Sequence, residues 1–336
     1  MKKSKSARSS SRFPSVRLRR LRSTRAIRDL FEETRLSPSD LVAPIFVQEG
    51  LSRPDVVKSM PDIRRLPLTH LIDEVEKILT LGIRAVILFG LPATKDKVAS
   101  SAYQEDGIVQ KSVSILRKRF GEKLVIMTDV CLCQYTDHGH CGIVVDKKID
   151  NDSSIETLAK VAVSHARAGA DIVAPSAMMD GQVQAIRRAL DLAGLKDVAI
   201  MGYSAKQASP LYAPFRDAAH STPEFGDRKS YQMHFANARE AMREVDADIQ
   251  EGVDIVMIKP AIPYLDLIYR TRNSTDLPIC AYSVSGEYAL IKAAALNGWA
   301  DEDAVMTEFL TSIKRAGADI IITYHAERMA RLLAKK

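Results

Sequence analysis

The sequence predicts an α/β fold, a (β/α)8 barrel of the TIM type with an extended N-terminal arm. Two observations support this: eight short, nearly continuous apolar runs follow residue 41, and segments with helical signals separate them. Parallel strands that are covered on both faces show such unbroken apolar runs. Eight strand–helix units with right-handed crossovers close most simply into a barrel, and a doubly wound sheet is the alternative.

The predicted strands share a β-branched, apolar character and span 41–48, 83–90, 124–130, 171–176, 198–206, 254–260, 278–284 and 319–326. Between them, 69–82, 154–170 and 300–318 carry apolar residues at helical spacing and reach a Gly near their ends. A join of Gly, apolar residue and Asp recurs before the fourth, sixth and eighth strands, as a repeated βα unit would produce. We therefore expect one barrel domain over 36–336.

The first 35 residues are predicted to form an arm separate from the barrel. Residues 1–28 hold 11 Lys and Arg and no acidic residue, which leaves 37 basic against 42 acidic side chains in the remainder. Such a segment can be a nucleic-acid tail, a targeting peptide or a subunit-docking segment. We expect the first dozen residues to be disordered. The apolar residues among the later charges favour docking on another subunit: Leu18, Leu21, Ile27, Leu30 and Phe31.

The hydropathy of the chain and the character of its N-terminal segment predict where the protein is located in the cell. The chain has no apolar stretch near the ~18 residues that a membrane span needs, and its basic start lacks the apolar region of a secretory signal. The short segment before the arm favours the cytoplasm over an organelle. We expect no membrane partner.

A long irregular segment, 207–232, follows the fifth predicted strand. It contains three prolines, a glycine and several charges, which argue against regular structure. Loops longer than ~12–15 residues are usually functional or disordered. We interpret this segment as a lid over an active site, and its basic residues Arg216, Arg228 and Lys229 as candidates for binding carboxylates.

Polar residues at the ends of the predicted strands mark the candidate site. Reactive groups of such barrels lie at the C-terminal ends of the strands. Those positions hold Asp129, Ser176, Lys206, Lys259, Ser283 or Ser285, and Tyr324. Two lysines on adjacent strand ends lower each other's pKa and leave a neutral amine that can attack a ketone. The alternative is that each lysine forms a structural ion pair with an acid such as Asp129.

Three of the four cysteines, Cys131, Cys133 and Cys141, lie within the segment DVCLCQYTDHGHCG (129–142). Their spacing, C-x-C-x7-C, indicates a metal or catalytic site in a reducing compartment rather than a disulfide framework. Three thiolates favour zinc and leave a fourth position open for water or substrate, unless His138 or His140 closes a structural site. Cys280, inside a predicted strand, is expected to be a core residue.

Six segments resemble the porphobilinogen synthase (5-aminolevulinate dehydratase) family: DVCLCQYTDHGHCG, APSAMMDG, MGYSAKQASPLYAPFR, GDRKSYQM, MIKPAIPYLD and YSVSGEY. The resemblance runs from about Arg17 to the end in the same order. It implies a barrel whose arm wraps a neighbouring subunit in a homo-octamer, and a hydro-lyase of tetrapyrrole (heme) biosynthesis that joins two molecules of 5-aminolevulinate.

The resemblance also implies a role for each residue. Lys259 and Lys206 would form Schiff bases with the first and second substrate, and Asp129 and Ser176 would assist proton transfers. Ser285 and Tyr324 would hold one carboxylate, and Arg216 and Arg228 the other, with Gln232 and Phe215 in the substrate pocket. Cys131, Cys133 and Cys141 would hold catalytic zinc, and Glu244 would bind an allosteric magnesium ion. His325 departs from the family pattern, in which a larger apolar or aromatic residue is expected.

Two other functional classes remain alternatives at this point. A Schiff-base aldolase would need the same barrel, one lysine and no zinc. A nucleic-acid-binding protein would use the basic arm and a structural zinc ion, but we expect no nucleic-acid partner.

Overall fold

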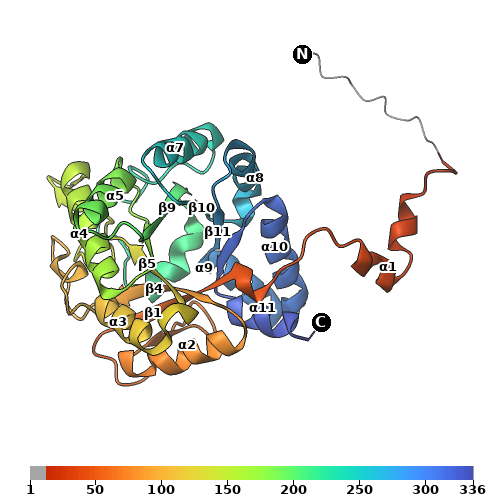
Figure 1. Ribbon diagram of the computed structural model, residues 1–336, viewed down its shortest axis with the longest axis horizontal. Coiled ribbons are helices and arrows are strands. Elements are labelled where there is room, and N and C mark those ends of the chain that lie inside the picture. Colours follow the sequence, from red (N-terminus) through yellow and green to blue (C-terminus); the bar gives the residue numbers. More distant parts are fainter. Residues whose placement is uncertain (1–12, 336) are drawn as a thin grey trace, which may run out of the picture. The chain divides into compact units, whose positions relative to one another are not determined.

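Eight parallel strands form a closed barrel in the computed structural model, which describes residues 13–335 (Figure 1). The strands pair in the order of the chain, and β12 returns to pair with β1, which closes the barrel. They are β1 (Leu41–Gln48), β4 (Ala85–Leu91), β5 (Val125–Val130), β8 (Ile172–Pro175), β9 (Ala199–Lys206), β10 (Ile255–Lys259), β11 (Ile279–Ser283) and β12 (Ile320–Thr323). The (β/α)8 prediction is confirmed, and the doubly wound alternative is excluded.

Helices follow the strands and surround the barrel (Figure 1). They are α2 (Leu71–Thr80), α3 (Ile108–Phe120), α4 (Asn151–Ala168), α5 (Gln182–Leu192), α7 (Ala238–Gln250), α8 (Leu265–Ser274), α9 (Ser285–Leu296), α10 (Glu302–Ala316) and α11 (Ala326–Leu333). The long segments predicted to be helical correspond to α2, α4 and α10. Two short additions were not predicted: β2 (Asp55–Val56) with β3 (Arg64–Leu66), and the hairpin β6 (Ile143–Val145) with β7 (Lys148–Asp150).

The chain divides into two units, one up to Arg35 and one from Leu36 onward. Within residues 13–35 there is a short 3-10 helix, Leu18–Arg22, and a helix α1, Arg25–Leu30, whose N-cap Thr24 accepts a hydrogen bond from the Ile27 amide. The first dozen residues, which we expected to be disordered, lie outside the described part of the chain.

The apolar core has two layers, as the unbroken apolar runs require. Alternate strand residues point into the barrel, among them Phe46, Phe89, Met257 and Tyr282. The residues between them, such as Val86 in β4, pack outward against the helices. Every strand is therefore apolar on both faces, which is why period-two alternation is missing from the sequence.

The repeated Gly–apolar–Asp join has a structural explanation. Gly169, Gly252 and Gly317 each have a positive φ between 93° and 123° where a helix ends, a conformation that favours glycine. The aspartates two residues later, Asp171, Asp254 and Asp319, accept hydrogen bonds of 2.7–2.8 Å from the amides of Ile126, Ile200 and Ile279. Each join thus ends one helix and ties the start of a strand to its neighbour.

Candidate active site

Lys206 and Lys259 lie opposite each other at the C-terminal ends of β9 and β10. The pairing of these strands shifts by one residue: Val256 pairs with Gly202, but Ile258 pairs with Ala205. The extra residue in β9 is a bulge, which re-aims the side chains that follow it. Because of this bulge, Lys206 rather than Ala205 follows Tyr203 into the barrel interior. Both lysines are buried.

The Lys259 ammonium is surrounded by aromatic rings. Its Nζ lies 4.1 Å from the ring centre of Tyr282, 5.0 Å from that of Tyr203, and 5.2 Å and 5.4 Å from those of Phe215 and Tyr212. Burial, and then the neighbouring Lys206, lower the pKa of Lys259 to about 7, although Asp129 opposes the shift. A substantial fraction of Lys259 is therefore a neutral amine near neutral pH, as a nucleophile for a ketone must be.

Asp129 and Ser176 lie at the ends of β5 and β8, where the sequence placed them. Asp129 is buried and its carboxylate accepts a hydrogen bond of 3.1 Å from the amide of Gln134. Burial raises the pKa of Asp129, whereas both lysines and Ser176 lower it. The Lys206 ammonium donates a hydrogen bond to the backbone carbonyl of Ser176. A carboxyl group with a raised pKa beside two amines can exchange protons with them.

The three cysteines of the C-x-C-x7-C segment converge at the same end of the barrel. Their sulfurs lie within 4.8 Å of one another, all three residues are buried, and none forms a disulfide. Hydrogen bonds from Cys131 and Cys133, with smaller contributions from Arg228 and Lys206, lower the pKa of Cys141. Three clustered sulfurs with nearby cations fit a soft metal ion such as zinc. Cys280 lies in the barrel interior instead, as expected.

The histidines of this segment do not join the cysteine cluster. Among residues 13–335, the only group of potential metal ligands found this close together is the three cysteines. Both ring nitrogens of His140 have other partners, the Tyr231 hydroxyl and the Phe225 carbonyl, each at 3.0 Å. The arrangement therefore favours three protein ligands and an open fourth position over a closed structural site.

The segment 207–232 contains more regular structure than its prolines suggested. A 3-10 turn, Pro210–Tyr212, leads into helix α6, Ala213–Ala218. The expectation of irregular structure is wrong here because Pro210 and Pro214 occupy first-turn positions, where a missing N–H costs no helical hydrogen bond. The remainder, as far as Gln232, is irregular.

The segment 207–232, which the sequence predicts to be a lid, brings polar groups with unused hydrogen-bonding capacity into the site. Arg228 and Gln232 are buried, and Arg216 is half-buried. The Nε atoms of both arginines and both amide atoms of Gln232 have no hydrogen-bond partner in the protein. Buried polar groups are normally paired. This cluster of unpaired donors therefore suits a charged, oxygen-rich ligand. Lys229, the third basic candidate, is exposed and forms an ion pair with Asp227.

Ser285 and Tyr324 lie across the barrel opening, at the starts of α9 and of the segment after β12. The Ser285 hydroxyl accepts a hydrogen bond from the Phe215 amide and donates one to the Leu211 carbonyl. The Tyr324 hydroxyl lies 3.0 Å from that of Tyr282. His325 is buried against the ring of Tyr288, and burial lowers its pKa to about 3, so it fills the space behind Tyr324 as a neutral ring.

Glu244 lies on the outer helix α7, where it lines a cavity of about 840 Å³ together with Gln232 and Lys229. It also lines a smaller cavity of about 200 Å³ with three further acids, Asp180, Asp248 and Glu251, and with one cation, Arg243. Burial, and then Asp180 and Glu240, raise the pKa of Glu244.

Several residues of the site were not found from the sequence. Tyr203, Tyr212 and Tyr282 enclose Lys259. Tyr203 and Tyr282 lie in apolar strand runs, where nothing distinguishes an inward tyrosine from an outward one, and Tyr212 lies in the segment expected to be irregular. Glu287 is buried and accepts the amides of Ile262 and Val284, which joins the segment after Lys259 to the start of α9. Glu287 lies three residues after Val284, the N-cap of α9, and this spacing is the sequence signal from which its role could have been predicted.

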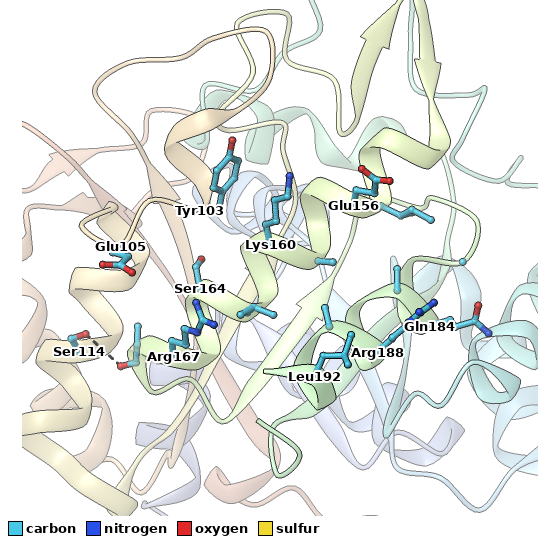
Figure 2. A pocket seen from close by; sticks show the side chains of 17 residues that line it. Tyr103, Glu105, Ser114, Glu156, Lys160, Ser164, Arg167, Gln184, Arg188 and Leu192 are labelled. Carbon is cyan, nitrogen blue, oxygen red and sulfur yellow. Dashed lines mark hydrogen bonds between the residues drawn. The ribbon is translucent and has the colours of Figure 1, made fainter. Parts of the chain in front are cut away.

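A second concavity, of about 990 Å³, lies between helices on the outside of the barrel (Figure 2). Figure 2 shows that Lys160 and Arg167 from α4 and Gln184 and Arg188 from α5 extend along it. None of its lining residues belongs to the lysine, cysteine or lid groups, so it is separate from the site described above.

No helix within residues 13–335 is long and apolar enough to cross a membrane.

Comparison with known proteins gives consistent matches over nearly the whole chain. Residues 15–332 match the family model described as delta-aminolevulinic acid dehydratase. A protein of that name from Archaeoglobus fulgidus is 56% identical over 96% of this chain and 99% of its own length. A protein of the same name from Bacillus subtilis is 53% identical over 95% of this chain and 98% of its own length. The crystal structure of the Toxoplasma gondii ME49 enzyme (porphobilinogen synthase), in complex with the reaction product porphobilinogen, superposes with a TM-score of 0.93 at 42% identity. It covers 95% of this chain and 92% of its own.

Proposed function

Since this chain belongs to the delta-aminolevulinic acid dehydratase family, we propose that it is a porphobilinogen synthase, a hydro-lyase of tetrapyrrole (heme) biosynthesis. Two molecules of 5-aminolevulinate would give one porphobilinogen and two molecules of water. The observation that carries this proposal is the pair Lys206 and Lys259, facing each other at strand ends beside three clustered cysteines.

Each lysine would bind one substrate as an imine. A neutral amine adds to the substrate ketone and one water leaves, so two imines account for the two waters of the reaction. Lys259, whose pKa is lowered to about 7, is suited to react first. Holding both substrates covalently converts a bimolecular condensation into an oriented reaction between neighbours. Both lysines return as free amines once the carbon–carbon and carbon–nitrogen bonds of the ring have formed.

The two substrate carboxylates would bind on opposite sides of the opening. Tyr324 would hold that of the Lys259-bound substrate, together with Ser285 once its hydroxyl turns from the Leu211 carbonyl to the substrate. Arg216, Arg228 and Gln232 would hold that of the Lys206-bound substrate, because their unpaired donors match a carboxylate. Phe215 packs over Lys259 and would shield its imine from water.

Asp129 would transfer the protons that the condensation moves. Its raised pKa reflects burial, which favours the protonated form, while the two lysines and Ser176 favour the charged form. A group balanced between these influences can act as an acid in one step and as a base in another. Ser176, beside it, would assist.

We propose zinc as the ion held by Cys131, Cys133 and Cys141. When bound, zinc supplies a Lewis acid that orients and polarises the second substrate. The protein's own part is to keep three thiols reduced, buried and within 4.8 Å, with no histidine among them. Such a thiol cluster requires a reducing compartment, in keeping with a cytoplasmic enzyme.

We also propose that Glu244 binds magnesium and that the arm, residues 1–35, docks on a neighbouring subunit of an octamer. Support for the first is the cavity around Glu244, in which four carboxylates outnumber the one cation, Arg243. Support for the second is the exposure of apolar side chains in the arm, including Leu18, Leu30 and Phe31.

Porphobilinogen formation, assayed with and without a chelator, tests the proposal. We expect activity in the zinc-loaded protein, its loss on chelation and its return with zinc. Added magnesium should stimulate the wild type and the control Glu308→Gln, which changes an exposed acid on α10, but not Glu244→Gln. Absence of porphobilinogen from zinc-loaded protein given 5-aminolevulinate would refute the assignment.

A further inference from the structure

The loop that follows β4 is joined to the cysteine segment by its backbone. The Asp96 amide donates to the Tyr135 carbonyl, and the Asp137 amide donates to the Asp96 carbonyl, each at 3.2 Å. The Asp96 carboxylate also accepts the amides of Val98 and Ser100 at 3.0 Å, which fixes the turn. The position of the preceding residue, Lys95, is therefore set by the segment that carries the cysteines.

Lys95 reaches from this loop to the lid. Its ammonium donates a hydrogen bond of 2.5 Å to the backbone carbonyl of His220, just beyond the end of α6. The side chain is half-buried: burial lowers the pKa of Lys95, and the nearby Cys133 raises it. One ammonium group thus lies between the cysteine cluster and the lid backbone.

Three cations hold neighbouring carbonyls at this turn of the lid. Arg65 donates to the Ala218 carbonyl at 2.9 Å, Lys95 to that of His220, and Arg228 to that of Ser221 at 2.6 Å. Arg65 and Arg228 are buried, whereas Lys95 remains accessible to water. The Lys95 contact is therefore the one of the three that can open without leaving a buried charge unpaired.

His220 itself has a backbone conformation that needs support. Its φ is 47°, in the left-handed region that a residue with a side chain occupies only at a cost. Such conformations persist when surrounding contacts impose them. The hydrogen bond from Lys95 to the carbonyl of His220 is such a contact. The buried Arg228 lies eight residues further along the same segment.

We propose that Lys95 is a positioning residue that latches the lid to the cysteine segment and so sets the places of Arg216 and Arg228. The assignment of those arginines to a substrate carboxylate rests on the proposed function, but the latch itself does not. Lys95 touches neither substrate nor metal in this proposal. It acts through the backbone of the lid, and its removal should loosen the turn around His220 while the barrel stays unchanged.

Hydrogen exchange of the full-length, substrate-free protein tests the latch. In Lys95→Met, the amides of residues 219–228 should exchange about tenfold faster, as expected for loss of a hydrogen bond from a charged donor. Lys97→Met is the matched control, since Lys97 is an exposed lysine on the same loop. Lys95→Arg should restore slow exchange because it keeps a charged donor, and Lys95→Gln serves as a second neutral variant.

The outcomes separate the latch from the function. Exchange at 219–228 that is unchanged in both neutral variants would overturn the proposal, as would faster exchange spread over the barrel strands. With 5-aminolevulinate, Lys95→Met should raise KM about tenfold with kcat little changed. If hydrogen exchange at 219–228 becomes faster while KM stays the same, the latch proposal is supported. That result would count against the role of Arg216 and Arg228 in binding a substrate carboxylate.

Discussion

Lys206 and Lys259 are cross-strand partners, and they face each other because β9 contains one residue more than β10 over the preceding stretch. Without that bulge, strict alternation after Tyr203 would turn Ala205 inward and Lys206 outward. The bulge also brings each ammonium over the ring of Tyr203, at 5.4 Å from Lys206 and 5.0 Å from Lys259. A local irregularity of one strand therefore creates the paired amines.

The pairing predicts opposite pH shifts in two variants. Lys206 lowers the pKa of Lys259 and Asp129 raises it. Imine formation at Lys259 should increase with pH through a midpoint of about 7, since only the neutral amine reacts. Lys206→Met should move the midpoint above 7, and Asp129→Asn should move it below 7. The rate of borohydride-trapped adduct formation against pH measures this, and shifts in the same direction would contradict the account.

The cysteine cluster predicts a metal that serves chemistry rather than folding. Cys133→Ser should lose bound zinc and activity while its Tm stays within a few degrees of the wild type, because the three cysteines are a small part of a core formed mainly by apolar strand and helix residues. Cys280→Ser is the control. Cys280 lies in the barrel interior and outside the cysteine cluster, so this variant should keep its bound zinc. Metal analysis and thermal unfolding measure both, and unfolding on zinc removal would instead indicate a structural site.

From the buried side chain of Gln232 we expect a substitution that weakens substrate binding without lowering the free energy of unfolding. Its amide is buried without a partner, so Gln232→Met should leave the free energy of unfolding unchanged or higher. The same change should raise KM for 5-aminolevulinate about tenfold or more, since a hydrogen bond to a charged group contributes about 1.5–3 kcal/mol. Urea unfolding and steady-state kinetics test the pair of outcomes. A loss of stability with unchanged KM would mean that the amide has only a structural role.

Gly286 predicts a steric effect at the base of the lid. A Cβ at this position would lie 2.6 Å from both Cα and O of Leu211, which are backbone atoms that cannot rotate away. Gly286→Ala should destabilise the protein by about 1–3 kcal/mol and disturb the neighbouring Ser285. Ala293→Ser, on the exposed side of the same helix, is the control. If Gly286→Ala unfolds in urea like the wild type, this contact is not tight in solution.

Most of the fold could be predicted from the sequence because the barrel strands are apolar on both faces and recur with Gly–Asp joins. The positions of Lys206, Lys259, Asp129 and Ser176 followed from the ends of those strands, and the cysteine cluster followed from its C-x-C-x7-C spacing. The aromatic enclosure of Lys259 did not, since it depends on side chains far apart in the chain. The bulge in β9 did not either, since it shows only in the pairing with β10. Helix α6 was missed because its prolines, in the sequence alone, argue against regular structure. The contact of Lys95 with the lid spans 125 residues and has no local signal.

Borohydride trapping with 5-aminolevulinate, followed by peptide mass analysis, tests whether both lysines form imines. We expect covalent adducts on both Lys206 and Lys259, and we expect Lys259→Met to abolish turnover while zinc remains bound. Adducts confined to one lysine would contradict the double-imine scheme and favour aldolase-type chemistry. An active Lys259→Met variant, or no adduct at either lysine, would contradict the role assigned to the pair.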